Sequence, residues 1–318
     1  MAVYTPVSDA AAAAFLADYD LGSLVRLVPI AEGVENSNFL AETTTGPLIL
    51  TLYEKRVDPA DLPFFLGLME HLAARGVRCP LPVRARDGTA LRELAGRPAA
   101  IVSFLDGKAL TTGTVDACRQ VGGALARLHR AGTEFALTRA NALSVAGWQD
   151  LVARTSAGAD GVAPGLGAEV ASALAVVAER WPTTLPMGVI HADLFPDNVF
   201  FDAGQLTGLI DFYFACTDAL AYDVAVCLNA WCFEAPDWRW NPDKAAALLQ
   251  GYEAARPLSE GERQALPILA TGAALRFLLT RLYDWINHPP GALVTPKDPL
   301  EYRAKLRFFR ETPAALPR

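Results

Sequence analysis

Residues 191–198 read HADLFPDN and place one histidine, two aspartates and an asparagine just before an apolar run. Residues 199–201 and 206–210 have the length and composition of short strands, and DAGQ between them predicts a turn near Gly204. If these strands pair antiparallel about a midpoint between residues 204 and 205, Asn198 lies opposite Asp211. Asp193 comes five residues earlier, in a loop that Pro196 helps to fix.

These residue types at this spacing fit phosphoryl transfer to an alcohol. The amide oxygen of Asn198 and the carboxylate of Asp211 hold a divalent cation well once phosphate oxygens complete its shell. The carboxylate of Asp193, held beside that cation, orients a hydroxyl and accepts its proton. The alternatives are ordinary turn chemistry of Asp and Asn and a hydrolytic metal site on His191 and Asp193. The latter is disfavoured because the chain has only four histidines, and no other lies near.

Neighbouring polar residues have simpler interpretations. His191 is expected to brace the loop through hydrogen bonds, and Asp197 to be an exposed loop-capping acid or else a second metal contact. Asp223 lies in the apolar stretch AYDVAV and, as a buried acid that needs partners, is expected to tie the loop to the helices. The aromatic residues Trp231, Phe233, Trp238 and Trp240 either line an acceptor pocket or pack under a loop.

Composition limits the classes of protein. With 318 residues, 52% hydrophobic and 20% charged, the chain can bury a large core. A net charge of −7 without a basic cluster argues against nucleic-acid binding. Five cysteines without paired spacing predict reduced, buried thiols. Since no basic leader and no uninterrupted membrane-length apolar run is seen, we expect a cytoplasmic protein with no membrane partner.

The pattern of elements predicts an α+β fold with two lobes. After an opening helix, residues up to 102 are strand-rich, with one helix at 60–75 that Gly76 ends. Apolar residues then recur every three or four positions from Thr114 onward, which indicates helices. We therefore expect an N-terminal lobe at 1–102, a hinge at 103–108 and a C-terminal lobe at 109–318. The Gly/Ala/Ser-rich stretch 156–168 is the candidate mobile loop.

HADLFPDN followed by LIDFYFA resembles the catalytic and metal-binding motifs of the aminoglycoside phosphotransferase-like kinases, which share the protein-kinase-like fold. The strand-rich lobe, IVSFLDG and ALARLH occur in the expected order. Four further blocks are similar to the bacterial homoserine kinases of this fold, namely GVENSNFLAET, ILTLYEKRV, RFLLTRLYDW and VTPKDPLEY. The resemblance implies Asp193 as the base, Asn198 and Asp211 as Mg²⁺ ligands, and backbone contacts of Ser103, Phe104 and Leu105 to the adenine of ATP.

The phosphate-binding residues depart from the family pattern. Thr51 occupies the strand position where these kinases usually carry a lysine that touches the phosphates. Lys55, four residues on, is the candidate replacement, with Glu70 as its helix partner, although both could be surface charges. The loop EGVENSN has one glycine, so contacts from its polar residues Asn36, Ser37 and Asn38 are expected instead.

The resemblance implies ATP-dependent phosphorylation of the side-chain hydroxyl of L-homoserine, a step of threonine synthesis. An amino-acid acceptor needs a cation for its carboxylate and an acid for its ammonium group. Arg276, Arg281 and Asp284 are the candidates, although Arg281 and Asp284 could form an ordinary surface pair. The alternatives are a kinase for another small hydroxyl compound, such as choline or an aminoglycoside, and a catalytically silent kinase-like binding module. The sequence does not indicate an oligomeric state.

Overall fold

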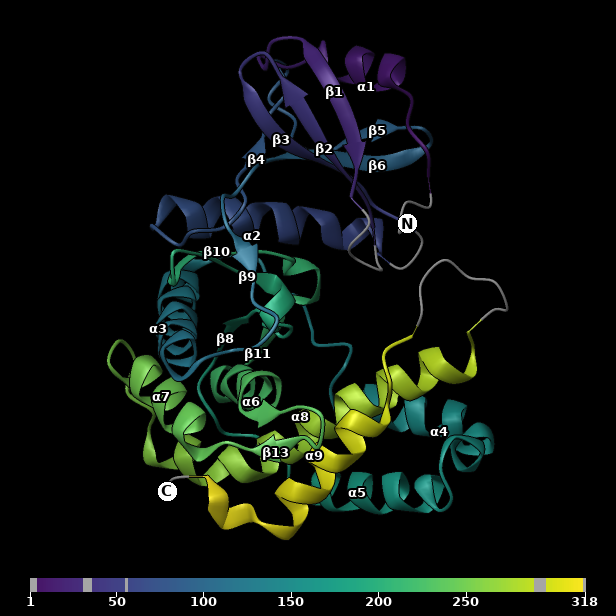
Figure 1. Ribbon diagram of the computed structural model, residues 1–318, viewed down its shortest axis with the longest axis vertical. Helices are drawn as coiled ribbons and strands as arrows, with labels where there is room; N and C mark the ends of the chain where they lie inside the picture. The colour runs from purple at the N-terminus through teal and green to yellow at the C-terminus, as the bar shows by residue number, and fades with distance from the viewer. Residues whose placement is uncertain (1–4, 31–35, 55–56, 289–295, 317–318) are drawn as a thin grey trace. The chain divides into compact units, whose positions relative to one another are not determined.

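The computed structural model describes residues 5–30, 36–54, 57–288 and 296–316. By their contacts, residues 1–107 and 207–213 form one compact unit, unit 1, and residues 108–206 and 214–318 form unit 2. Unit 1 is strand-rich and unit 2 is mainly helical, so the predicted α+β class is confirmed (Figure 1). The sequence places 207–213 in the C-terminal lobe, whereas Thr207 Oγ1 donates to Asp106 O and Leu209 N to Arg78 O, both in unit 1.

Unit 1 is built on an antiparallel sheet with the strand order β1-β2-β3-β6-β4, and β5 pairs with β6. Strand β2 shows the alternation that a half-buried strand requires, since every second residue from Ser37 to Thr43 is buried. The elements of unit 1 are α1 (Asp9–Leu16), β1 (Leu24–Pro29), β2 (Ser37–Thr43), β3 (Gly46–Leu52), α2 (Leu62–Ala74), β4 (Pro82–Val83), β5 (Arg92–Leu94) and β6 (Arg97–Ser103).

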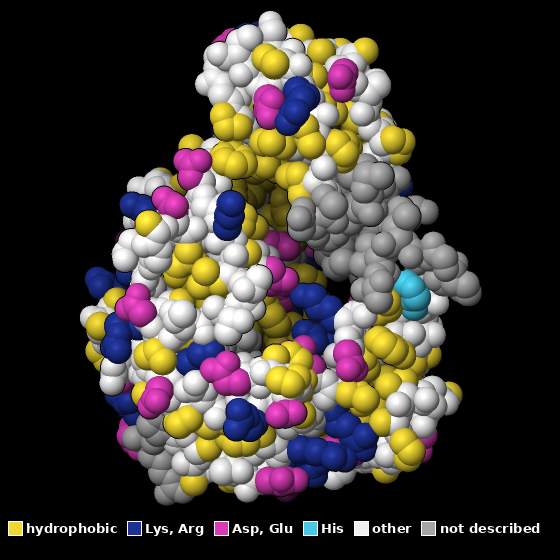
Figure 2. All heavy atoms as spheres, in the orientation of Figure 1, with side chains coloured by type: hydrophobic (Ala, Val, Ile, Leu, Met, Phe, Trp, Pro, Cys, Tyr) yellow, Lys and Arg dark blue, Asp and Glu magenta, His cyan; other side chains and the backbone are white. Residues whose placement is uncertain are grey.

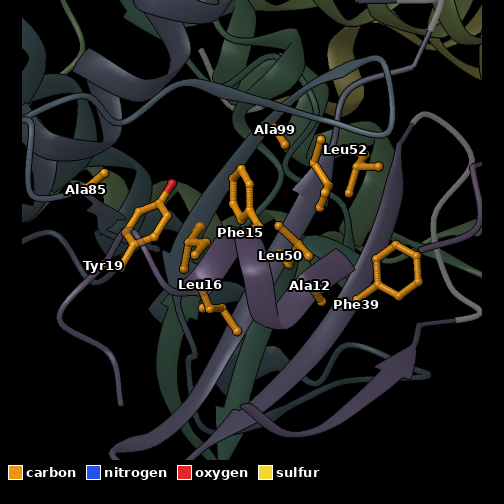
Figure 3. Packing of buried hydrophobic residues seen from close by; sticks show 11 residues of the cluster. Ala12, Phe15, Leu16, Tyr19, Phe39, Leu50, Leu52, Ala85 and Ala99 are labelled. Carbon is orange, nitrogen blue, oxygen red and sulfur yellow. The ribbon is translucent and has the colours of Figure 1, made fainter. Parts of the chain in front are cut away.

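The core of unit 1 lies between α1 and the sheet. Phe15 and Leu16 of α1 pack against Leu50 and Leu52 of β3, with Phe39 of β2 at the edge (Figure 3). Ser8 caps this helix, because its side chain accepts a hydrogen bond from the Ala11 amide. Burying large apolar side chains on one face of the sheet stabilises unit 1 through the hydrophobic effect.

Unit 2 consists mainly of helices, with short strands between them, of which β10 passes into unit 1 at Thr207. Its helices are α3 (Val115–Ala131), α4 (Val145–Val162), α5 (Leu166–Arg180), α6 (Leu220–Trp231), α7 (Pro242–Glu253), α8 (Glu260–Ile286) and α9 (Leu300–Glu311). The strands that begin in it are β7 (Lys108–Ala109), β8 (Met187–Ile190), β9 (Val199–Asp202), β10 (Gln205–Leu209), β11 (Cys216–Ala219), β12 (Phe233–Glu234) and β13 (Arg239–Trp240).

Helices α6 and α8 pack against each other in the centre of unit 2 (Figure 1). Every residue of α6 except Ala230 is buried, and α8 is buried along most of its middle. A capping box of Ser259 and Glu262 starts α8. Within the described residues, α8 is the one helix with the length and composition to cross a membrane, but 72% of its apolar window is buried inside the fold.

The prediction of a mobile loop at 156–168 was wrong. Residues up to Val162 continue α4, and α5 begins at Leu166 after a short turn at Gly165, where φ is +74°. Gly158 of α4 faces Ile286 of α8, and a β-carbon at Gly158 would lie 2.9 Å from the Ile286 side chain. The small residues therefore allow close helix packing, a use that composition alone does not distinguish from a flexible linker.

Two features of composition have structural counterparts. All five cysteines are buried and free, which confirms the prediction of reduced thiols. On the face of unit 2 that Figure 2 shows, basic and acidic side chains are interspersed, with no extended patch of one sign.

Candidate active site

The predicted catalytic loop of unit 2 runs from β8 to β9. Strand β8 pairs antiparallel with β11, and Ile190, its last residue, lies opposite Cys216. The short 3₁₀ turn Pro196–Asn198 then leads into β9. Ala192, just before the predicted base, has φ of +63°, a left-handed conformation that a non-glycine residue adopts only when its surroundings hold it.

Asp223 of α6 holds the start of this loop. Its carboxylate accepts hydrogen bonds from the amides of His191, at 2.7 Å, and Ala192, at 2.8 Å. His129 Nε2 lies 3.1 Å from the same carboxylate, and His129 Nδ1 lies 2.8 Å from the Tyr252 hydroxyl. Burial raises the pKa of Asp223, but its hydrogen bond to His129 and the nearby histidines outweigh burial, so the pKa is lowered overall. The predicted structural role of Asp223 is confirmed.

His191 braces the loop, as the sequence predicts. Its side chain is fully buried, and its Nδ1 accepts a hydrogen bond of 3.3 Å from the amide of Asp193. The backbone of Asp193 is therefore fixed by a side chain of its own loop.

Asn198 contacts the predicted base directly. Its amide nitrogen lies 2.8 Å from the Asp193 carbonyl oxygen and 3.3 Å from carboxylate oxygen Oδ2 of Asp193. Because both partners are acceptors, the nitrogen of the Asn198 amide must face them. Its oxygen, Oδ1, accepts no hydrogen bond from the described residues. This orientation fits a metal ligand, because Mg²⁺ binds oxygen and not amide nitrogen.

Arg276 of α8, expected to contact the substrate, also reaches the loop. Its side chain is nearly fully buried, and its Nη1 donates to the carbonyl oxygen of Ala192. Its Nη2 lies 4.0 Å from Oδ1 of Asp193. Asp193, Asn198 and Arg276 therefore form one connected group within unit 2.

Asp211, the second predicted metal ligand, belongs to unit 1, so its pairing with Asn198 stays a prediction. Asp211 has φ of +63°, and Tyr213, two residues on, lies 3.3 Å from the Tyr53 hydroxyl. The predicted hairpin turn exists but was misplaced by one residue. Its two residues are Ala203 and Gly204, both with positive φ, so its centre lies between 203 and 204. The midpoint from which the sequence set residue 198 opposite residue 211 was therefore one residue too late.

The residues expected to contact adenine lie at the end of β6 in unit 1. The amide of Ser103 donates to Leu81 O at 2.9 Å, and the Ser103 hydroxyl accepts from the Leu81 amide. Ser103 therefore joins the end of β6 to the residue before β4. Phe104 is 38% exposed, and Leu105 packs against Gly208. Among the described residues, no backbone hydrogen bond to Phe104 or Leu105 is formed, and their contacts to adenine stay a prediction.

Asn36, Ser37 and Asn38, expected at the phosphates, are bound to neighbouring residues of unit 1. The Ser37 hydroxyl donates to Glu54 at 2.7 Å, and the Asn36 side-chain oxygen accepts from the Glu54 amide at 3.4 Å. The Thr51 hydroxyl donates to the Asn38 side-chain oxygen at 2.8 Å. The Ser37 hydroxyl proton is therefore committed to Glu54, while phosphate contacts by the amide groups of Asn36 and Asn38 stay a prediction.

Lys55, the candidate phosphate cation, lies outside the described residues. Its suggested partner Glu70 forms an ion pair with Arg84, at 2.7 Å. The neighbour of Lys55, Glu54, is buried and lies 3.2 Å from Arg97. Sequence reasoning missed Glu54, although an acid directly after the apolar strand LILTLY was the available signal.

Arg281 and Asp284, the other predicted substrate residues, lie on α8. Arg281 forms an ion pair with Glu301 of α9, at 2.6 Å. The surface pair with Asp284, which the sequence offered as the alternative, is therefore not the ion pair that Arg281 forms. Glu301 also binds the buried Lys305, and both cations lie over the ring of Tyr302. Asp284 is half-buried. Substrate contacts by Arg281 and Asp284 stay predictions.

The remaining candidates have structural partners. Asp197 forms an exposed ion pair with Lys297 at 3.1 Å, as a loop-capping acid would. Trp231 is buried and donates to Leu194 O at 2.8 Å. Phe233 and Trp240 pack against aromatic residues of α9, so packing is what the structure shows for this part of the aromatic run.

Comparison with known proteins shows the family of this chain. The model of the phosphotransferase enzyme family matches residues 26–258. The homoserine kinase of Xanthobacter autotrophicus is 62% identical over 315 residues, covering 99% of this chain and 98% of that protein. The homoserine kinase of a Methylobacterium species is also 62% identical, with the same coverage.

Solved structures show the same fold at low identity. An amicoumacin kinase in complex with AMP-PNP and Ca²⁺ superposes with a TM-score of 0.69 at 13% identity, covering 96% of this chain and 93% of that one. The motif HADLFPDN lies in a braced loop, and the chain is similar to these relatives over nearly its whole length; it therefore belongs to the phosphotransferase enzyme family and, within it, to the homoserine kinases.

Proposed function

We propose that this protein transfers the γ-phosphoryl group of ATP to the side-chain hydroxyl of L-homoserine and releases O-phospho-L-homoserine and ADP. The observation that carries the acceptor is the 62% identity to homoserine kinases across 99% of the chain. The observation that supports the reaction class is the carboxylate of Asp193, which a braced loop holds beside the amide of Asn198.

Asp193 is the residue that receives the acceptor hydroxyl. In phosphoryl transfer the transition state is loose, so a protein contributes mainly by positioning the groups and stabilising charge. A carboxylate within hydrogen-bond reach of the hydroxyl aligns it with the phosphorus and takes its proton as the new bond forms. The side chain of Asp193 is 19% exposed, so it is accessible to a small alcohol while its backbone stays fixed.

Asn198 and Asp211 are the proposed Mg²⁺ ligands. The oxygen of the Asn198 amide is available for this role, because the amide nitrogen is the atom that binds Asp193. When bound, the cation neutralises charge on the β- and γ-phosphates. The same asparagine thereby orients the base with one end of its amide and presents a ligand oxygen with the other.

Unit 1 supplies the proposed nucleotide contacts. The backbone of Phe104 and Leu105 is proposed to hydrogen-bond adenine, since no described residue of the chain binds those groups. Asn36 and Asn38 are proposed to reach the phosphates through their amide nitrogens, and Lys55 to contribute a cation. With homoserine and ATP as ligands, every proposed partner is a small molecule.

The experiment is a measurement of ADP release with Mg·ATP and a panel of acceptors comprising L-homoserine, L-serine, choline and an aminoglycoside. The expected result is ADP release that depends on homoserine, with one phosphomonoester formed per ADP, as ³¹P NMR would show. Turnover with choline or the aminoglycoside but not with homoserine would replace the proposed acceptor. If nucleotide raises the melting temperature while no acceptor supports turnover, the protein is a silent binding module.

A further inference from the structure

Arg276 is an arginine in the apolar middle of α8, where a charge has no access to solvent. Only 1% of the residue is exposed. A buried guanidinium stays protonated and must therefore find acceptors inside the fold. The backbone acceptor that Arg276 reaches is the carbonyl oxygen of Ala192, one residue before the proposed base.

The peptide groups before and after Ala192 are each held by a charged side chain. Its amide donates to the buried carboxylate of Asp223 on α6, at 2.8 Å, and its carbonyl accepts from the buried guanidinium of Arg276 on α8. Two side chains of opposite charge, from two packed core helices, thus fix the left-handed conformation of Ala192, where φ is +63°. Because Asp193 follows immediately, the direction of its side chain depends on that conformation.

The guanidinium is itself held in place. Its central carbon lies 4.5 Å from the centre of the Phe277 ring and 5.6 Å from that of Phe214. Stacking on aromatic rings fixes the plane of an arginine and reduces the freedom that it must lose to bind. Arg276 is therefore a rigid support, and its Nη2 lies 4.0 Å from Oδ1 of Asp193.

The two carboxylate oxygens of Asp193 consequently face different groups. Oδ2 accepts from the Asn198 amide at 3.3 Å, and Oδ1 faces the Arg276 guanidinium at 4.0 Å. We infer that Arg276 is a positioning residue, which aims the carboxylate of Asp193 at the acceptor hydroxyl through the Ala192 carbonyl and through its own charge. It does not bind the carboxylate of the substrate. This inference rests on the proposed role of Asp193 and adds the residue that orients it.

The test compares the variants Arg276→Met and Arg276→Lys by steady-state kinetics, at a temperature where circular dichroism shows each to be folded. Methionine keeps much of the apolar bulk without the donors, and we expect kcat to fall roughly 10²-fold, the cost of a misaligned catalytic group. KM for ATP and for homoserine should stay within about 3-fold, since neither ligand contacts Arg276. Lysine keeps the charge but not the planar guanidinium group, so the kcat of Arg276→Lys should lie between those of wild type and Arg276→Met.

A double-variant comparison separates positioning from a stabilising role alone. If Arg276 acts through Asp193, the variant Asp193→Asn/Arg276→Met should be no slower than Asp193→Asn by more than about 3-fold, because residues that act as one unit are not additive. Arg303→Met is the matched control. It removes a partly buried arginine of α9 that pairs with Glu169, at 2.8 Å, so it should lower the melting temperature and leave kcat unchanged.

Three results would overturn the inference. The first is an Arg276→Met variant with wild-type kcat and only a lower melting temperature. The second is a rise in KM for homoserine at constant kcat, which would make Arg276 a substrate ligand. The third is a multiplicative loss in the double variant. If Arg276→Met does not fold, Arg276→Lys and its combination with Asp193→Asn decide between the same outcomes. Absence of wild-type turnover with homoserine would show that the proposed acceptor is wrong. The rates of the variants are therefore compared with that of wild type, using the acceptor that wild type phosphorylates.

Discussion

The side-chain nitrogen of Asn198 lies 3.3 Å from a carboxylate oxygen of Asp193 and 2.8 Å from the carbonyl oxygen of the same residue. One asparagine thus contacts the proposed base through its nitrogen, and its oxygen is the proposed cation ligand. Asn198→Ala should remove both functions, so we expect kcat to fall and the half-saturating Mg²⁺ concentration to rise roughly 10-fold or more. Turnover measured as a function of free Mg²⁺ at saturating ATP gives both quantities.

Asp197→Asn is the control for this prediction. Asp197 is adjacent in sequence, but it is exposed and pairs with Lys297, and an exposed ion pair contributes little. Its Mg²⁺ dependence should equal that of wild type. An equal shift in both variants would mean that the 3₁₀ turn, and not the asparagine oxygen, determines the response.

Asp193→Asn should lower kcat by at least ~10²-fold, because the amide cannot accept the proton of the hydroxyl. KM for ATP should hardly change, since the nucleotide contacts are proposed for other residues. The substitution keeps the size of the side chain and one oxygen, so the melting temperature should stay close to that of wild type. Initial rates with homoserine and a thermal melt measure the two effects. A variant with more than a tenth of the wild-type kcat would exclude Asp193 as the base.

Asp223→Asn should destabilise the fold in a pH-dependent way. The buried carboxylate accepts from the amides of His191 and Ala192 and contacts His129, and losing such bonds costs about 3 kcal/mol or more. The folded pKa of Asp223 is lowered, since its contacts with His129 outweigh burial. Its contribution is therefore present above the unfolded pKa of about 3.9 and is lost as pH falls through the folded value.

Urea unfolding from pH 7 to pH 3 checks this prediction. The free energy of unfolding of wild type should exceed that of Asp223→Asn at neutral pH, and the difference should shrink in acid. A difference that is constant across this range would show that the ionised carboxylate is not what stabilises the loop.

The loop was predictable because its signals are local. The mixture of Asp, Asn and Pro in HADLFPDN, followed by an apolar strand, indicated a braced polar turn, and Asp223 in an apolar helix indicated a buried acid that needs partners. The hairpin centre was missed because Ala203 adopts a positive φ, which alanine rarely does, so the turn sequence pointed to Gly204 alone.

Long-range contacts account for the partners that the sequence did not indicate. The partner of Arg276 is the carbonyl of Ala192, 84 residues away, and periodicity along α8 does not show which face of the helix meets the loop. Ser37, at the start of β2, donates to Glu54, two residues beyond the end of β3, whereas the sequence assigned Ser37 to the phosphates from its place in the polar loop EGVENSN. In both cases the contact joins residues that are distant in the sequence, so the residue type was predictable and its partner was not.

Gly122→Ala should destabilise unit 2 by about 2 kcal/mol, because the backbones of α3 and α7 meet at two glycines. A β-carbon at Gly122 would lie 2.0 Å from the carbonyl oxygen of Leu248, and one at Gly251 would lie 2.0 Å from that of Arg119. Since neither helix can yield without moving the other, the added methyl group strains both. Gly261→Ala is the control: it lies in the first turn of α8 with open space around its β-carbon position, and alanine favours helix, so its stability should equal or exceed wild type by up to ~1 kcal/mol. Thermal and urea unfolding of both variants measure the contrast, and equal stabilities would show that α3 and α7 do not pack this closely.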